Sequence, residues 1–310
     1  MRALELTCLC IVLLYIVVRL QRRGDESIGE LLSRFVWLAA TSALGEDTMI
    51  RLHGFYDYAE GWSLPLDRVP LLIVLIWPIV IDSASQIAGG LCRALRRPES
   101  TRNVAIATGL VVLVDAWLIE PIATQSGLWR WHAPGLFGVP PIGVLGWAIF
   151  AGLVTWLRPL AFRRSGCALV RLGQPVVASV LAILGTHAIL IAAWWLLFRP
   201  LNRTLPTAIG IAVAWLVLLP IAAFFLRIRA GRAVPVSNLL VRVPAAAFFF
   251  VLLAVRKDAI GAAQGPLLLY ALAFAAPYWV LVFARSARPQ NGATETEGAN
   301  TRAATGLAQR

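Results

Sequence analysis

The chain is poor in charged residues. Asp, Glu, Lys and Arg make up only 14% of its 310 residues, whereas they make up about 25% of an average soluble domain. Hydrophobic residues account for 59%. So few charged side chains leave too little polar surface to cover a soluble globule of this length. The composition therefore excludes a disordered protein and a cytosolic enzyme.

Cysteine is also scarce. The four cysteines are Cys8, Cys10, Cys92 and Cys167, and the first two lie inside an apolar segment. No Cys/His pair elsewhere completes the spacing of a zinc site. The sequence therefore excludes a secreted disulfide scaffold, predicts no metal site, and indicates that these cysteines are small apolar residues in helices.

Acidic residues are outnumbered by basic ones, 16 to 28, which gives a net charge of +12. The basic residues are nearly all arginines, and they form short clusters at the ends of apolar segments, such as Arg93, Arg96 and Arg97. Cytoplasmic loops of membrane proteins carry such an excess of positive charge. We therefore interpret the charge as a determinant of membrane topology and predict no nucleic-acid partner.

The sequence contains many apolar segments of about 20 residues, which is the length that a membrane-spanning helix needs. The alternation typical of outer-membrane barrels is not seen. The sequence thus predicts an all-α, polytopic membrane protein with eight or nine transmembrane helices. The nine candidate spans are Ala3–Leu20, Ile28–Leu44, Pro70–Cys92, Asn103–Thr124, Ile142–Leu160, Pro175–Phe198, Pro206–Leu226, Val236–Val255 and Gly265–Phe283.

Alternate loops between these spans are rich in arginine, which predicts an N-terminus outside and a C-terminus inside a bacterial cytoplasmic membrane. Segment 28–44 is the weakest span, because it is short and contains Arg34. A re-entrant or interfacial helix is the alternative there, although losing the span would break the alternation. We expect one transmembrane domain over residues 1–285 and a disordered cytoplasmic tail over residues 286–310.

Three of the carboxyl groups in the predicted spans are candidates for chemistry, and they are Asp82, Asp115 and Glu120. Ionisable groups in hydrocarbon are costly and are functional candidates. Asp82 and Asp115 lie at similar depth on adjacent helices, so a structural pair through a shared proton or a Ser/Gln partner is the alternative. Asp115 and Glu120 are about 140° apart around a regular helix. Pro121 disfavours helical backbone at Glu120, so a loosened helix could turn Glu120 toward a site.

Two predicted outer loops combine carboxylates with aromatic side chains and a histidine. The residues of interest in segments 45–69 and 126–147 are Glu46, Tyr56, Tyr58, Trp129, Trp131, His132 and Trp147. An interfacial aromatic belt would explain the tryptophans alone. The mixture over one membrane face, the same face as Glu120, is also what an enzyme acting on a lipid-like substrate needs.

The order of these motifs resembles the integral-membrane carotenoid 1,2-hydratases. Glu46 is followed by HGFYDY and VPLLIVLIW, and an acidic residue before proline is followed by GLWRW and GVPPIGVLGW. The resemblance covers residues 46–147, and the later spans match only as generic apolar helices. This chain carries Glu120 where the family usually has aspartate and Gly143 where it usually has asparagine, and the distance from Glu46 to Gly54 is shorter.

The resemblance implies a lyase that hydrates the terminal 1,2 double bond of an acyclic carotenoid within the bilayer, with water as co-substrate and no cofactor. Protonating such an alkene needs a positioned acid, and burial favours the protonated form of a carboxyl. The resulting cation needs aromatic faces or a carboxylate beside it. In this hypothesis Asp115 is the acid and Glu120 or Glu46 orients water. The expected substrate contacts are Trp129, Trp131, Tyr56, Tyr58, Trp147, His132 and Asp82.

Two other classes of function remain open from the sequence. A non-catalytic carotenoid-binding membrane protein fits the departures at Gly143 and in the first motif. A proton-coupled small-molecule transporter would use Asp82, Asp115 and Glu120 as relay groups, although the sequence shows no clear repeat of the kind that transporters have.

Overall fold

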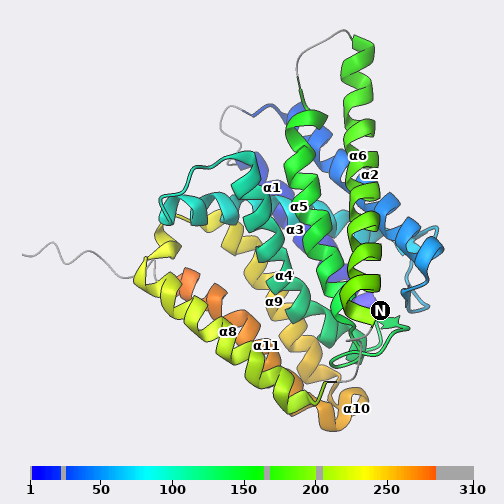
Figure 1. Ribbon diagram of the computed structural model, residues 1–310, viewed down its shortest axis with the longest axis vertical. Coiled ribbons are helices and arrows are strands. Elements are labelled where there is room, and N and C mark those ends of the chain that lie inside the picture. The colour runs from blue at the N-terminus through cyan, green and yellow to red at the C-terminus, as the bar shows by residue number, and fades with distance from the viewer. Residues whose placement is uncertain (1, 22–25, 164–167, 200–204, 284–310) are drawn as a thin grey trace, which may run out of the picture.

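The computed structural model describes residues 2–21, 26–163, 168–199 and 205–283, which form an all-α helical bundle (Figure 1). The long helices are α1 (Arg2–Gln21), α2 (Ile28–His53), α3 (Leu71–Ala94), α4 (Thr101–Gln125), α5 (Pro141–Ala161), α6 (Ala168–Ala193), α8 (Thr207–Arg227), α9 (Val236–Val255) and α11 (Gln264–Phe283). The predicted tail 286–310 and Cys167 lie outside the described residues.

Shorter elements connect these helices. A π-helix, η1 (Trp194–Phe198), continues α6, and the remaining helical turns are η2 (Ala230–Arg232), α10 (Lys257–Ile260) and η3 (Gly261–Ala263). The connections before α3 and α5 contain the strands β1 (Tyr56–Tyr58), β2 (Pro65–Leu66), β3 (Val69–Pro70) and β4 (Trp129–Trp131).

Eight of the described helices are long and apolar enough to cross a membrane. The prediction of a polytopic helical membrane protein is thereby confirmed, and most predicted helix ends agree with the structure within a few residues. The exception among the long helices is α2, which is too polar to count among the eight.

Helix α2 extends to His53, nine residues beyond the predicted end at Leu44. The hydropathy falls after Leu44, but the following residues still favour a helix, which ends only where Gly54 adopts a left-handed conformation. The prediction that Glu46 lies in a loop is therefore wrong, because Glu46 is part of α2.

Helix α2 runs across the bundle antiparallel to α3. Arg34, near its start, lies 3.6 Å from Asp82 in the middle of α3. Glu46, near its end, is hydrogen-bonded to Trp77 in the first turns of α3. Helix α2 therefore runs alongside α3 from the middle of that helix to its first turns.

Helix α4 is central to the bundle and packs against α3, α5, α9 and α11. Its contact with α5 is close: a Cβ atom built on Gly109 would lie 2.9 Å from the carbonyl oxygen of Ala148 and 3.9 Å from the Cα of Gly152. Small residues let transmembrane helices approach in this way. Helices α8 and α11 pack side by side along another edge of the bundle (Figure 1).

The close approach of α4 and α5 predicts an asymmetry between two glycine substitutions. We expect Gly109→Ala to lower the free energy of unfolding by about 1–3 kcal/mol, because the new methyl group would overlap backbone atoms. Gly173→Ala on α6, where an added Cβ meets nothing within 4 Å, should be neutral or stabilise by up to about 1 kcal/mol. Thermal unfolding in detergent measures both, and equal effects would contradict the packing.

Candidate functional site

The strands β1 and β4 form a two-stranded antiparallel sheet over one end of the bundle. Tyr56 pairs with Trp131, and Tyr58 pairs with Trp129. Side chains two residues apart in a strand point to the same face. The Tyr-x-Tyr and Trp-x-Trp motifs therefore present four aromatic side chains on one face. The ring centroids of Tyr56 and Trp131 are 4.7 Å apart, and those of Tyr58 and Trp129 are 5.8 Å apart.

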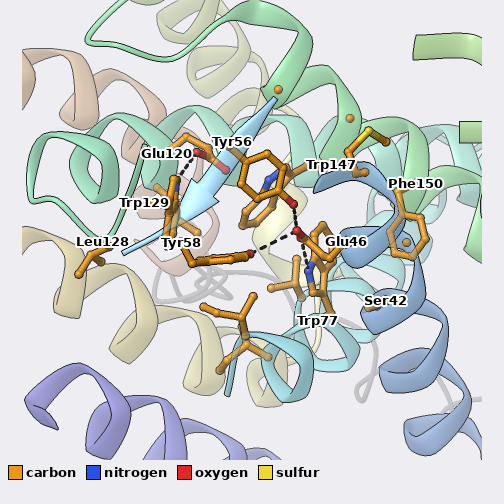
Figure 2. Close-up of a pocket in the computed structure, with 18 of the residues that line it drawn as sticks. Ser42, Glu46, Tyr56, Tyr58, Trp77, Glu120, Leu128, Trp129, Trp147 and Phe150 are labelled. Carbon is orange, nitrogen blue, oxygen red and sulfur yellow. Dashed lines mark hydrogen bonds between the residues drawn. The ribbon is translucent and has the colours of Figure 1, made fainter. Parts of the chain in front are cut away.

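The two tyrosines donate hydrogen bonds to Glu46. The hydroxyl groups of Tyr56 and Tyr58 both reach Oε2, the latter at 3.2 Å. The indole Nε1 of Trp77 on α3 donates to Oε1 at 2.9 Å. Figure 2 shows Glu46 pointing from α2 into the space beneath the sheet, with these three donors around it. Both carboxyl oxygens of Glu46 are thus engaged.

The two tryptophans bind Glu120 in the corresponding way. Trp129 Nε1 donates at 2.7 Å and Trp131 Nε1 donates at 2.9 Å, and both bonds end on Oε2. Glu120 is 2% exposed. Helix α4 continues without interruption through Pro121 to Gln125, so the expected loosening is wrong. Glu120 reaches the site from its position on a regular helix.

Glu46 and Glu120 line one cavity of about 160 Å³ beneath the sheet. Apolar and aromatic side chains form almost all of its wall, including Trp77, Trp147 and Phe150. The rings of Trp77 and Trp147 lie with their centroids 4.7 Å apart. No arginine, lysine or histidine contributes to this wall among the described residues. The two segments expected to form outer loops lie together with Glu120 at one end of the bundle.

Asp115 lies outside this cavity. Its carboxylate is bound by Arg242 on α9, at 2.6 and 2.7 Å, and accepts a hydrogen bond of 2.5 Å from Tyr278 on α11. The predicted separation of Asp115 and Glu120 around α4 is correct, since the two side chains serve different cavities.

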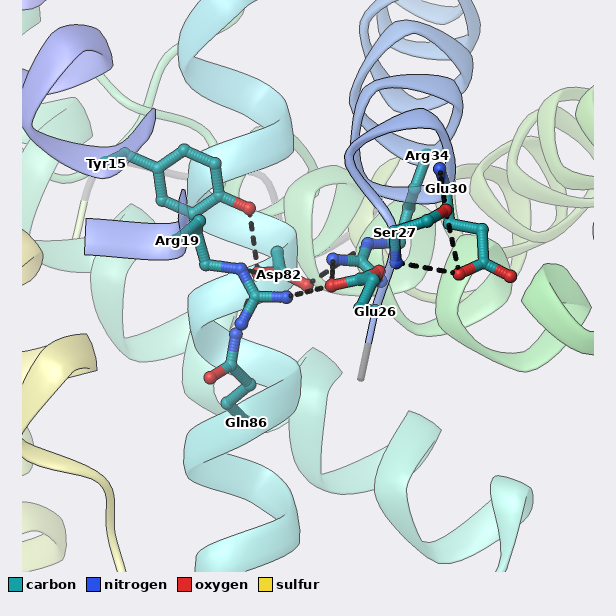
Figure 3. Close-up of polar contacts among 8 residues, drawn as sticks. All are labelled: Tyr15, Arg19, Glu26, Ser27, Glu30, Arg34, Asp82 and Gln86. Carbon is teal, nitrogen blue, oxygen red and sulfur yellow. Dashed lines mark hydrogen bonds and ion pairs between the residues drawn. The ribbon is translucent and has the colours of Figure 1, made fainter. Parts of the chain in front are cut away.

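Asp82 is likewise engaged elsewhere. It is 3% exposed and accepts hydrogen bonds from Tyr15 and Gln86, each at 2.8 Å. Arg19 and Arg34 lie 3.5 and 3.6 Å from its oxygens. Figure 3 shows this cluster, in which Asp82 joins α1, α2 and α3. Asp82 and Asp115 are therefore not a mutual pair, although the expectation of a glutamine partner for Asp82 is correct.

His132 does not line the cavity beneath the sheet. Its Nδ1 is 2.7 Å from the carbonyl oxygen of Gly54, and its Nε2 is 2.9 Å from Asp57. The histidine is exposed on the outer side of the sheet. Its placement beside the cavity was expected from the sequence, and the strand geometry turns it away.

Trp77, Arg242 and Tyr278 are among the residues that hold carboxyl groups and that were not singled out from the sequence. Arg242 carried a usable signal, because an arginine inside the apolar segment 236–255 is as costly as an aspartate there. Trp77 and Tyr278 had none, since aromatic residues are ordinary in apolar helices. Within the described ranges, no group of three or more His, Cys, Asp and Glu side chains is placed to hold a metal ion.

Gly143, the first of two glycines in the initial turns of α5, makes room for Trp131. A Cβ atom at this position would lie 2.4 Å from the Trp131 ring. The indole therefore occupies the space that any larger residue at position 143 would need. Its hydrogen bond to Glu120 depends on this glycine.

One of three comparisons with known proteins found a match. A family model described as carotenoid biosynthesis protein matches residues 5–226. Neither a curated protein nor a solved structure matches the chain.

The contact between Gly143 and Trp131 predicts coupling between the two positions. We expect Gly143→Ala to lower the free energy of unfolding by about 1–3 kcal/mol by displacing the indole. Gly146→Ala, one helical turn on, is the matched control, because its Cβ would make only a 3.4 Å contact with Leu190. In a Trp131→Ala background, the cost of Gly143→Ala should vanish. An unchanged cost in that background, measured by thermal unfolding in detergent, would contradict the coupling.

Proposed function

Because the chain belongs to the carotenoid biosynthesis protein family, we propose that it adds water across the terminal 1,2 double bond of an acyclic carotenoid. One observation carries this proposal: Glu46 and Glu120 share an apolar cavity in which every hydrogen-bond donor to them is a neutral hydroxyl or indole group. Such a cavity suits a hydrocarbon substrate and a carboxylic acid beside it.

The two carboxyl groups differ in the hydrogen bonds that they accept, and this difference suggests a different role for each. Hydrogen bonds donated to a carboxylate favour its charged form. Glu46 receives donors on both oxygens, which suits a carboxylate that accepts a proton. The two hydrogen bonds from the sheet to Glu120 both end on Oε2, and Trp147 is a further donor to this carboxyl group. We propose that Oε1 carries the proton of the carboxylic acid. We assign Glu120 as the general acid and Glu46 as the general base.

The reaction then runs in two steps. The Glu120 proton is transferred to carbon 2 of the alkene, whose π electrons form the new C–H bond and leave a tertiary cation at carbon 1. A water oxygen bonds to carbon 1 and loses a proton to the Glu46 carboxylate. The faces of Trp77 and Trp147 are suited to stabilise the cation between these steps. A proton passed from Glu46 to Glu120 through water restores the starting state.

Asp115 has no part in this mechanism. Its carboxylate is paired with Arg242 and lies outside the cavity that Glu46 and Glu120 share. Its bonds to Arg242 and Tyr278 connect α4 with α9 and α11. We propose that Asp115 is a structural residue and that Asp82, beside two arginines, is one as well.

The cytoplasmic membrane of a bacterium remains the proposed location, with the N-terminus outside. In this orientation the aromatic sheet and both glutamates lie toward the outer face. The arginine-rich connections around Arg93 and Arg229 lie toward the cytoplasm, which is the side that the positive-inside rule assigns to them.

The carboxyl roles are tested by amide substitutions in a host that makes lycopene. We expect Glu120→Gln to reduce hydrated product about 100-fold or more, because a positioned general acid contributes that much. Glu46→Gln should also reduce it strongly. Pigment extraction and mass analysis, which detects the gain of one water, measure the product.

Asp47→Asn is the matched control, because Asp47 adjoins Glu46 in the chain but is bound to Arg51 and does not line the cavity. It should hydrate lycopene at the unsubstituted rate. Undiminished product from Glu120→Gln would contradict the assigned acid. If the unsubstituted protein leaves lycopene unchanged but retains it on purification, a carotenoid-binding protein is indicated instead. If the protein neither hydrates nor retains lycopene, a transporter is favoured.

A further inference from the structure

A second apolar cavity adjoins the one beneath the aromatic sheet. It measures about 230 Å³ and lies among α3, α4, α9 and α11. Five residues belong to the walls of both cavities, and they are Ile11, Ile76, Val80, Ile119 and Ala245. The two spaces are therefore separated only by apolar side chains that both of them share.

The polar residues in the wall of the second cavity neutralise one another. Arg242 donates to Asp115, to Ser83 at 3.0 Å and to the carbonyl oxygen of Val80 at 3.0 Å. Tyr278 donates to the same aspartate. The guanidinium and the carboxylate are thus paired and hydrogen-bonded, which is the condition for tolerating charges in an apolar environment. The wall accepts hydrocarbon without leaving a charge unpaired.

The second cavity also reaches the surface of the bundle. Val243 on α9 is 48% exposed and Trp279 on α11 is 54% exposed, and both line this cavity. Both helices are among the eight that are long and apolar enough to cross a membrane. The mouth between them therefore faces lipid rather than water.

We infer that the two cavities form one channel, which admits an extended isoprenoid chain sideways from the bilayer. The reacting end lies beneath the aromatic sheet, and the rest of the chain passes Ile119 and Ala245 into the second cavity and out between α9 and α11. The first cavity alone, at about 160 Å³, is too small for a whole carotenoid. The identity of the reacting end rests on the proposed function, but the binding path does not.

The junction between the cavities is tested by filling it. Ala245→Phe places a ring in the empty space that the cavities share, and we expect the purified protein to retain about tenfold less lycopene per mole, because the ring occupies the volume of the chain. Ala254→Phe is the matched control, since Ala254 is exposed on the same helix and lines neither cavity. It should retain lycopene like the unsubstituted protein.

Ile119→Phe obstructs the same junction from α4 and should reproduce the loss. Gel filtration and thermal unfolding identify a variant that fails to fold. If one obstructing variant does not fold, lycopene retention by the other one tests the channel.

The outcomes separate this inference from the proposed function. Lycopene retained equally by Ala245→Phe, Ile119→Phe and the unsubstituted protein would overturn the channel, whatever product forms. The channel is also overturned if the unsubstituted protein retains no lycopene. Retention that the obstructing variants abolish, without any hydrated product, would support the channel and refute hydration.

Discussion

The site depends on one physical requirement, which is that carboxyl groups buried among apolar side chains need hydrogen-bond donors. A buried polar group without a partner costs about 1–3 kcal/mol, and more if it is charged. Glu46 and Glu120 obtain their donors from two short strands whose alternation directs four aromatic side chains to one face. The pairing of β1 with β4 therefore satisfies both glutamates together, and it covers the end of the cavity that they share.

Asp82, Asp115, Glu46 and Glu120 fall into two kinds according to the groups that bind them. Asp82 and Asp115 lie beside arginines, and each ties several helices together. Glu46 and Glu120 have only hydroxyl and indole donors. The first kind is ion-paired with guanidinium groups outside the cavity beneath the sheet, whereas the second kind lines that cavity. This difference in partners, rather than depth in the bundle, distinguishes structural from catalytic candidates.

The departures from the family pattern become intelligible in the same setting. With Gly143 in place of asparagine, the ring of Trp131 occupies the space beside α5 and can donate to Glu120. Glutamate in place of aspartate at position 120 extends the carboxyl by one methylene group toward these indoles. Positions 143 and 120 thus meet at one hydrogen bond, from Trp131 to Glu120.

The sequence by itself determined the membrane-spanning all-α class, most helix boundaries, and the region that carries the site, because hydropathy and motif spacing are local properties. It also indicated that Asp115 and Glu120 face different directions, which follows from helical periodicity. It placed Glu46 in a loop, whereas Glu46 is part of α2. It assigned the acid role to Asp115, whose carboxylate is bound by Arg242 in the structure. Only the tertiary structure decided which carboxyl meets an arginine, because Arg242 lies 127 positions from Asp115 along the chain and no local pattern connects them.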